Sequence, residues 1–128
     1  MPLISVDDLA VREIFPGLRA RLIHTDRQTH SWVQADAGAS FLEHQHPHEQ
    51  IVSVIEGELE LVVEGTTHRL TPGVVFVIPP DARHSGRAVT ACRVLDVFSP
   101  ARDDYRQPCV GSDARHWLPG VRPRGDRE

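Results

Sequence analysis

The sequence predicts an all-β protein with a single domain, folded as a barrel or sandwich. Short apolar segments follow one another along most of the chain, and Gly or Pro residues separate them. The 128 residues suffice for one hydrophobic core but not for two comfortable domains. The segment Leu59–Glu64 alternates in character, so Leu59, Leu61 and Val63 are expected on a buried face.

Ten strands are expected, each bounded by a turn residue or by a change in the apolar pattern. Turns are placed at Gly38, Gly57 and Gly65, and at the segments Thr71–Gly73 and Pro79–Ala82. The expected strands are Val11–Phe15, Leu18–His24, Thr29–Asp36, Glu43–Gln50, Ile51–Glu56, Glu58–Glu64, Thr67–Leu70, Val74–Ile78, Arg83–Arg87 and Val89–Phe98.

The C-terminal part of the chain differs from the strands. Pro100–Arg106 is expected to form a helical turn, because it has a proline at its start and two aspartates early in the segment. From residue 107 onward, Pro and Gly interrupt a charged stretch whose one apolar anchor is Trp117-Leu118. We therefore expect a barrel domain over residues 1–106 and an irregular tail over residues 107–128.

Charge and hydropathy exclude several classes of partner. The formal net charge is -4 and no basic block occurs, so no nucleic-acid partner is expected. The longest apolar run, Val74–Ile78, is far shorter than the roughly 20 residues that span a bilayer, so no membrane segment is expected. The first residues do not resemble a secretory signal, and Cys92 and Cys109 form no CxxC pair. These features indicate a cytoplasmic protein.

The stretch Glu43–Gln50 holds three histidines, two carboxylates and an amide within eight residues. If it is extended, side chains alternate between faces, so His44, His46 and Gln50 share one face and Glu49 lies on the other. Two imidazoles two residues apart with a third donor on the same face have the spacing of metal ligands on a strand. A His-rich surface segment without a specific ligand is the alternative.

Two spaced motifs extend this pattern. The first reads Gly38-x5-His44-x-His46-x3-Gln50-x6-Gly57, and the second reads Gly73-x5-Pro79-x-Asp81-x2-His84. Together they resemble the two motifs of the cupins, a family of small β-barrels (jelly rolls of the RmlC-like type) in which both motifs contribute to one metal site. The chain departs from the family at three positions. Gln50 replaces the usual Glu, Asp81 replaces Gly, and Ala88 replaces Asn.

The resemblance implies that His44, His46, Gln50 and His84 bind one divalent metal at the barrel centre. Imidazole and amide ligands suit Zn, Ni, Fe, Mn or Cu, and the sequence does not choose among these metals. Glu49 remains an alternative to Gln50 as the fourth ligand. A neutral Gln50 cancels none of the metal's charge, which favours binding of an anion or enolate over the 2-His-1-carboxylate chemistry of Fe(II) oxygenases.

The closing segment, Asp96-Val97-Phe98-Ser99-Pro100-Ala101-Arg102-Asp103-Asp104-Tyr105, narrows the resemblance. It is similar to the corresponding segment of the KdgF-type cupins of pectin degradation, which linearise 4,5-unsaturated uronates. The resemblance implies that Asp96 is an acid/base catalyst, that Phe98 packs against the sugar ring and that Arg102 grips the substrate carboxylate. Arg19 and Arg21 are the alternative carboxylate ligands, and His48 is expected at the barrel mouth or behind the metal ligands.

The expected function is a non-redox, metal-dependent enzyme that opens and ketonises a small unsaturated uronate or a similar anionic sugar acid. One alternative is a dioxygenase or isomerase that acts on another small anion. A second alternative is a non-catalytic cupin that binds or senses a small molecule. A homodimer is expected, because small cupins commonly bury sheet surface between subunits.

Overall fold

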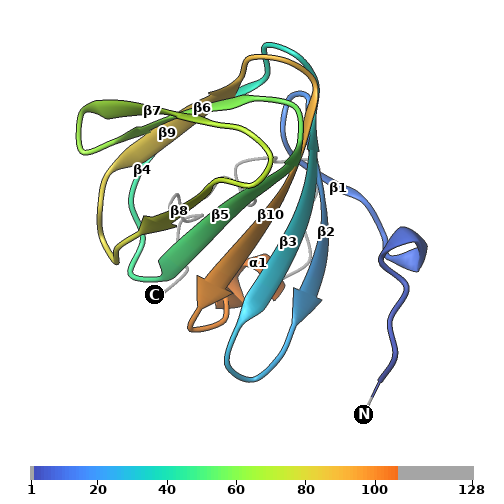
Figure 1. The fold of residues 1–128 in the computed structure, drawn as a ribbon. Coiled ribbons are helices and arrows are strands. Elements are labelled where there is room, and N and C mark those ends of the chain that lie inside the picture. Colours follow the sequence, from blue (N-terminus) through green and yellow to red (C-terminus); the bar gives the residue numbers. More distant parts are fainter. Residues whose placement is uncertain (1, 107–128) are drawn as a thin grey trace.

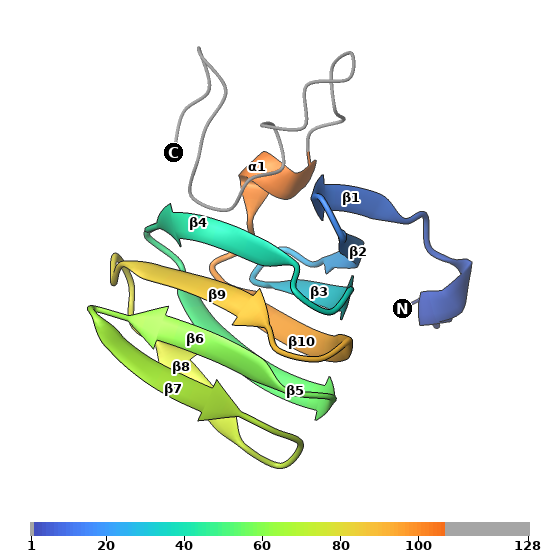
Figure 2. The same cartoon turned by 90° about the horizontal axis from the view of Figure 1, so that it is seen from above.

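Two antiparallel β-sheets face each other and enclose the core (Figures 1 and 2). The structure, a computed structural model, describes residues 2–106. The strands are β1 (Arg12–Phe15), β2 (Leu18–His24), β3 (Thr29–Ala35), β4 (Ser40–His44), β5 (Glu49–Glu56), β6 (Leu59–Val63), β7 (Thr66–Leu70), β8 (Val75–Ile78), β9 (His84–Ala88) and β10 (Cys92–Ser99). A 3-10 turn, η1 (Val6–Asp8), precedes them, and a short helix, α1 (Asp103–Arg106), follows.

The strand order interleaves distant parts of the chain. One sheet has six strands in the order β1-β2-β3-β10-β5-β8, and the other has four in the order β4-β9-β6-β7. Strand β10 lies between β3 and β5, so residues near the end of the described chain pair with residues 37 to 69 positions earlier, from Arg93 with Glu56 to Phe98 with Thr29. The barrel prediction is confirmed, and this order brings β5 and β10 side by side in the wall that carries the site.

The core follows the period of two expected for strands with one buried face. In β6, Leu59, Leu61 and Val63 are buried as predicted, at 7%, 1% and 7% exposure. The neighbouring strands alternate in the same way, so that their inward side chains meet between the sheets. Apolar burial from both sheets therefore supplies the main stabilising term of the fold.

The turn at Gly57 between β5 and β6 requires glycine. Its φ of 89° lies in the left-handed region, and a Cβ there would come within 2.3 Å of the Ala91 carbonyl oxygen. Any side chain would therefore push β10 away from this turn. The turn at Gly57 thus lies directly against Ala91 and Cys92 at the start of β10.

One strand prediction is wrong. Glu43–Gln50 does not form a continuous strand, because β4 ends at His44 and β5 begins at Glu49. Pro47 lies between them and lacks the backbone N–H that a paired strand needs. His44 thus belongs to the four-stranded sheet and Gln50 to the six-stranded sheet, while His46 lies in the connection.

The predicted tail over residues 107–128 lies outside the described residues, as does Cys109. No helix in the described part of the chain is long and apolar enough to cross a membrane.

Candidate metal centre

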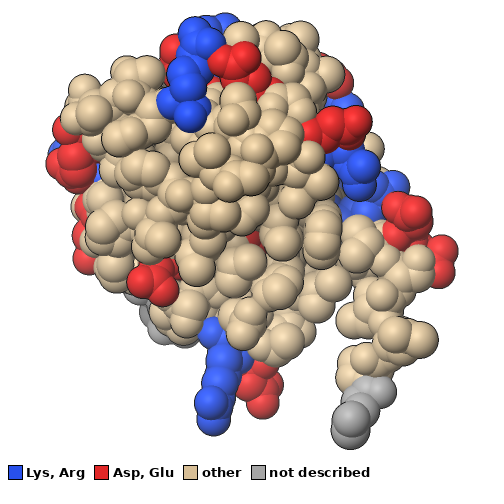
Figure 3. Space-filling model, viewed as in Figure 1, with Lys and Arg blue, Asp and Glu red and all other residues tan. Residues whose placement is uncertain are grey.

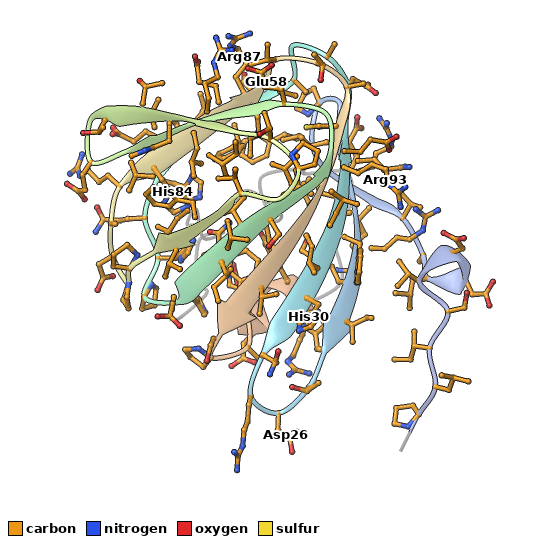
Figure 4. All side chains as sticks on the ribbon, in the orientation of Figure 1. Asp26, His30, Glu58, His84, Arg87 and Arg93 are labelled. Carbon is orange, nitrogen blue, oxygen red and sulfur yellow. The ribbon has the colours of Figure 1, made fainter. Side chains whose placement is uncertain are left out.

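Three histidines from separate elements converge between the sheets. His44 ends β4, His46 follows in the loop, and His84 begins β9, where it is the register partner of His44. Their candidate ligand nitrogens lie within 4.8 Å of one another. All three side chains are buried, and Figure 4 shows His84 pointing into the space between the sheets. The sequence prediction that these residues meet holds, although they come from two strands and a loop.

Backbone carbonyls fix the tautomer of each ring. Each Nδ1 lies within hydrogen-bonding distance of a carbonyl oxygen two residues away, and a carbonyl only accepts, so each Nδ1 must carry the proton. A neutral ring in this arrangement leaves its Nε2 lone pair available as a ligand. The distances are 2.8 Å from His44 to Leu42, 3.1 Å from His46 to His48 and 2.9 Å from His84 to Ala82.

The residues fit a divalent transition metal. The Nε2 atoms of His44 and His84 are buried and have no hydrogen-bond partner among the described residues. Burial lowers the pKa of His44 to about 3 and that of His46 to about 2, and it also lowers the pKa of His84. The three rings therefore stay neutral at ordinary pH. Three neutral imidazoles with converging lone pairs form a donor set that such a cation would satisfy.

Gln50 joins this group from β5. Its Oε1 lies 3.1 Å from His46 Nε2, and its side chain also hydrogen-bonds to Asp96. The amide thus connects the histidine cluster with the carboxyl group on β10. A glutamate here would place a second carboxylate beside Asp96, with like-charge repulsion that the amide avoids. The alternative ligand Glu49 is exposed at the start of β5, so Gln50 remains the predicted fourth ligand.

A cavity of about 60 Å³ lies next to the histidines. Apolar side chains of both sheets form most of its wall, and the polar residues on the wall belong largely to the candidate site. An apolar lining with a few convergent polar groups is the composition of small-molecule sites, and the volume of this cavity is below the roughly 300 Å³ at which such sites usually begin. The lining includes Phe15, Leu18, Val33, Phe41, Leu59, Leu61 and Val94, together with His44, Gln50, His84, Asp96, Ser31, Phe98 and Tyr105.

Asp96 is a carboxylate on the cavity wall. It lies opposite Ser31 on β3 and Val52 on β5, and it shares the inward face of β10 with Phe98, as predicted. Burial raises its pKa to about 7, while the Gln50 hydrogen bond and the positive charge of Arg102 oppose the shift. The group can therefore exist in either protonation state near neutral pH.

Comparison with known proteins identifies the family. The model of the Cupin domain family matches residues 31–98, which span β3 to β10 and contain all four predicted ligands and Asp96. The chain is a cupin.

Solved structures support the same assignment. KdgF from Halomonas sp. is 33% identical, with a TM-score of 0.77, and the match covers 82% of this chain and 98% of that one. An RmlC-like cupin from Shewanella frigidimarina is 30% identical, with a TM-score of 0.76, over 80% of this chain and 94% of that one.

Curated relatives match over shorter stretches. An uncharacterized HTH-type transcriptional regulator, YobQ of Bacillus subtilis, is 36% identical over 67 residues, or 49% of this chain and 28% of that protein. L-ectoine synthase of Thermobifida fusca is 40% identical over 55 residues, or 41% of each chain. This cupin thus matches well under half of the length of either relative.

Two aromatic rings form the apolar side of the cupin's site. Phe98, predicted from the sequence, has its ring 5.6 Å from that of His46. Phe41 on β4 was not predicted, yet its ring lies 5.5 Å from His44 and 6.5 Å from His84. Gly86 makes room for it, because a Cβ on Gly86 would meet the Phe41 ring at 2.6 Å. A glycine inside a predicted strand was the available signal.

The structure corrects the prediction for Arg102. Its side chain is fully buried and does not line the cavity. Its Nε and Nη2 donate hydrogen bonds to the two carboxylate oxygens of Asp104, at 3.0 and 2.7 Å. The guanidinium carbon lies 4.7 Å from the centre of the Phe98 ring and 4.1 Å from that of Tyr105. Arg102 therefore cannot grip a substrate carboxylate directly in this structure, although its charge still lowers the pKa of Asp96.

The alternative arginines also lie away from the cavity. On β2, Leu18 and Ala20 are buried, so Arg19 and Arg21 point to the opposite, outer face of the sheet. Arg19 forms a two-pronged ion pair with Asp36 at the surface. Neither Arg19 nor Arg21 lines this cavity, and contact of either with a substrate carboxylate stays a prediction.

His48 lies behind the metal ligands rather than on the cavity wall. Its side chain is buried, with its ring 5.4 Å from that of His46 and 6.4 Å from that of Phe98. Its carbonyl oxygen accepts the hydrogen bond that orients His46. This location agrees with the expectation that His48 lies behind the metal ligands. Direct contact of His48 with a substrate stays a prediction.

Proposed function

We propose that this cupin is a metal-dependent, non-redox enzyme that opens the ring of a small 4,5-unsaturated uronate and ketonises the resulting enol. The observation that carries the proposal is the placement of one carboxyl group, Asp96, on the wall of the same cavity as His44 and His84, two members of the cluster of three neutral histidines. That combination provides a proton carrier beside an electrophilic centre. A protein that only binds a ligand has no need of the proton carrier.

Similarity supports the choice of substrate class. KdgF of Halomonas is 33% identical over nearly its whole length, and the closing segment of this chain resembles that of the KdgF-type cupins. Three residues of that segment, Asp96, Phe98 and Tyr105, face the cavity here, and the resemblance assigns Asp96 and Phe98 to the substrate.

The chemistry needs proton transfers and no oxidant. Ring opening breaks the bond between the ring oxygen and the anomeric carbon. The anomeric hydroxyl loses a proton as it becomes an aldehyde, and the former ring oxygen gains a proton as it becomes the enol hydroxyl on C5. The released enol then gains a proton at C4 and loses the one on its C5 oxygen, which forms a ketone. Asp96 as carboxylate can accept a proton from a substrate hydroxyl, and as carboxylic acid it can deliver one to C4.

The remaining residues of the site would hold the metal, set the electrostatic environment and contact the sugar ring. His44, His46, His84 and Gln50 would hold the metal, which when bound supplies a Lewis acid for the substrate oxygens. All four donors are neutral, so they would leave the positive charge of a bound metal uncancelled, and the buried Arg102, which is paired with Asp104, still lowers the pKa of Asp96. This electrostatic environment favours an anionic sugar acid. Phe41 and Phe98 provide apolar contact for a sugar ring.

The test uses an unsaturated uronate released by a polyuronate lyase. Loss of the double-bond absorbance is followed with metal-loaded protein, with metal-free protein and without protein. The proposal expects acceleration above the spontaneous rate only with the metal-loaded protein. Absence of acceleration with every one of the metals Zn, Ni, Fe, Mn and Cu would reject it.

The alternative outside the enzymes is a non-catalytic sensor of a small molecule, and the similarity to the transcriptional regulator YobQ favours it. A sensor would bind the uronate and return it unchanged. Binding measured by calorimetry without loss of absorbance would therefore select this alternative. Oxygen uptake with small enols as substrates would select the dioxygenase alternative instead.

A further inference from the structure

A second cavity lies beside the short helix α1, apart from the histidine cluster, and we call it the α1 pocket. Its volume of about 320 Å³ falls within the roughly 300–1,000 Å³ of small-molecule sites, whereas the cavity next to the histidines has about 60 Å³. Side chains of β1, β2 and α1, and one residue before β1, form its wall. The lining residues are Ala10, Arg12, Leu22, His24 and Arg106.

Two arginines line the α1 pocket, and backbone carbonyls hold both of them. Arg12 donates a hydrogen bond from Nη1 to the carbonyl oxygen of Tyr105, at 2.8 Å. Arg106 donates from Nη2 to the carbonyl oxygen of Thr25, and its Nη1 has no hydrogen-bond partner in the described part of the chain. A carbonyl orients a guanidinium group without cancelling its charge. The positive charge of these two side chains is therefore held at fixed positions on the pocket wall.

No acidic side chain among the described residues lines this pocket. Asp103 pairs with Arg106 at 3.1 Å, but its side chain is 85% exposed and lies outside the lining. On the face seen in Figure 3, by contrast, the basic side chains lie at the margin beside Asp and Glu side chains. Arg87 and Arg93, for example, lie 3.6 and 3.7 Å from glutamate oxygens. The α1 pocket thus combines a concave shape with an excess of positive charge.

His24 presents a hydrogen-bond donor to the α1 pocket. Its Nδ1 lies 2.8 Å from the hydroxyl oxygen of Thr29, which also accepts a hydrogen bond from the Arg102 backbone N–H. Thr29 is fully buried, and His24 Nδ1 is the acceptor that the described residues offer to its hydroxyl proton. The ring therefore carries its own proton on Nε2. This tautomer is the reverse of that of the three metal-site histidines, so His24 offers an N–H group where they offer a lone pair.

The charges of the arginines reach the His24 ring. Burial, and after it the positive charges of Arg106 and Arg12, lower the pKa of His24, while Asp103 and Asp104 oppose the shift. The ring is therefore neutral at neutral pH and contributes an N–H donor without a charge. Fixed positive charges together with an N–H donor in a concave space favour the binding of an anion.

We propose that the α1 pocket is a second binding site, which takes a small molecule that carries an oxyanion, either a carboxylate or a phosphate group. Arg12 and Arg106 supply the charge, His24 donates from Nε2, and Leu22 offers apolar contact to the rest of the molecule. Guanidinium groups bind carboxylate and phosphate with parallel hydrogen bonds, so both anions suit these donors. This site lies outside the metal centre and does not depend on the reaction proposed there.

A molecule in the α1 pocket would also stabilise the docking of α1. Arg12 and Arg106 are the residues that fasten this helix to β1 and to the end of β2, and Figure 2 shows α1 beside β1. Tyr105, the neighbour of Arg106 in α1, lines the cavity with the histidines, so the two cavities share this helix as a wall. Binding should therefore raise the midpoint of thermal unfolding as the concentration of the bound molecule rises.

The test is isothermal titration calorimetry of the metal-free, full-length protein at constant ionic strength. Two probes are used, inorganic phosphate and D-galacturonate, a saturated uronate without the double bond of the proposed substrate. The wild type is expected to bind at least one probe with a dissociation constant below about 10 mM. Binding of phosphate alone or of galacturonate alone supports the proposal in either case and identifies which oxyanion the pocket prefers.

Two variants locate the binding. Arg106→Gln removes one charge from a half-exposed side chain, and His24→Asn keeps an acceptor for the Thr29 hydroxyl while it removes the Nε2–H donor. Each should raise the dissociation constant of the bound probe at least about tenfold, with an unchanged circular dichroism spectrum. Arg87→Gln is the matched control, because Arg87 is also a half-exposed, ion-paired arginine but lies on the four-stranded sheet, and it should bind like the wild type.

Thermal unfolding with and without the bound probe gives the second readout. The midpoint of the wild type should rise with the probe, and that of Arg106→Gln should rise much less. A wild type that binds neither probe would overturn the proposal, and so would wild-type affinity in Arg106→Gln. An equal loss of affinity in Arg87→Gln would assign the binding to overall charge and would also overturn it.

Discussion

Asp96 shows how one residue acquires its role from its surroundings. An aspartate on a strand is usually exposed and ionised, whereas Asp96 lies on a cavity wall and is hydrogen-bonded to Gln50. Desolvation raises its pKa to about 7, so protonated and ionised forms coexist near neutral pH. An acid/base catalyst that must both accept and deliver a proton works best with a pKa in this range.

Replacement of this carboxyl group tests its role. Asp96→Asn keeps the shape and the hydrogen-bonding capacity of the side chain but cannot transfer protons. We expect the rate with unsaturated uronate to fall by roughly 10²- to 10⁴-fold, while metal content stays at the wild-type level. Stopped-flow absorbance and elemental mass spectrometry measure the two quantities. A full rate in Asp96→Asn would remove Asp96 from the mechanism.

The metal ligands are tested by metal content. His44→Ala and His84→Ala each delete one of the converging Nε2 donors, so bound metal should fall below about one tenth of the wild-type amount. Glu49→Ala is the matched control, since Glu49 is an exposed neighbour of the site, and it should retain the metal. Metal loss in Glu49→Ala would show that the carboxylate, and not the Gln50 amide, completes the site.

At the scale of elements, the apolar alternation and the turn residues predicted most strands. They missed the break between β4 and β5, which is the boundary that matters for the site. The alternation from Glu43 to Gln50 suggested one strand, and the two ends lie instead on two sheets. His44, His46 and Gln50 still converge, because the turn around Pro47 carries the chain from one sheet to the other across the cavity. The motif spacing therefore predicted that these residues meet, although the assumed strand geometry was wrong.

The helix α1 shows what the sequence did not reveal. Arg102 follows a proline and precedes two aspartates, a pattern that usually lies at the surface. Burial of its guanidinium depends on the Phe98 and Tyr105 rings and on the Asp104 carboxylate meeting around it, and this follows only from the docking of α1 against β10. Nothing in the local sequence distinguishes the buried Asp104 from its exposed neighbour Asp103.

That difference gives a prediction about stability. Asp104→Asn leaves the buried Arg102 charge without its counter-charge and should lower the free energy of unfolding by about 3–5 kcal/mol. Asp103→Asn is the matched control, because Asp103 pairs with Arg106 at the surface and its side chain is 85% exposed, so the unfolding midpoint should hardly change. Urea denaturation measures both. Equal effects in the two variants would contradict the assigned location of Arg102.

At the scale of the whole molecule, the buried titratable groups set how stability depends on pH. In the metal-free protein, burial lowers the pKa of His44 to about 3 and that of His46 to about 2, so between about pH 4.5 and 6 unfolding takes up about two protons at these rings. The pKa values of His84 and His24 are lowered as well, and these rings add to the uptake. Asp96 acts in the opposite direction, because its raised pKa means that unfolding releases about one proton. Net uptake of at least about one proton means that stability falls as the pH falls.

The expected slope is at least about 1.4 kcal/mol per pH unit, since each proton contributes about 1.4 kcal/mol. Urea unfolding of the metal-free protein at pH 6 and pH 5 measures it. His44→Gln removes one of the protons taken up and should lower the slope by about 1.4 kcal/mol per pH unit. Stability that is independent of pH, or that rises as the pH falls, would contradict the burial of the three neutral rings.

The central claim is that Asp96 and the histidine cluster share one cavity and direct a proton to C4 of the substrate from one side. Ketonisation of an unsaturated uronate in D₂O, analysed by NMR before the product exchanges, tests this most directly. The metal-loaded wild type is predicted to place deuterium at C4 in a single configuration, while Asp96→Asn gives the mixture of the spontaneous reaction. An equal mixture of configurations from the wild type would contradict the claim.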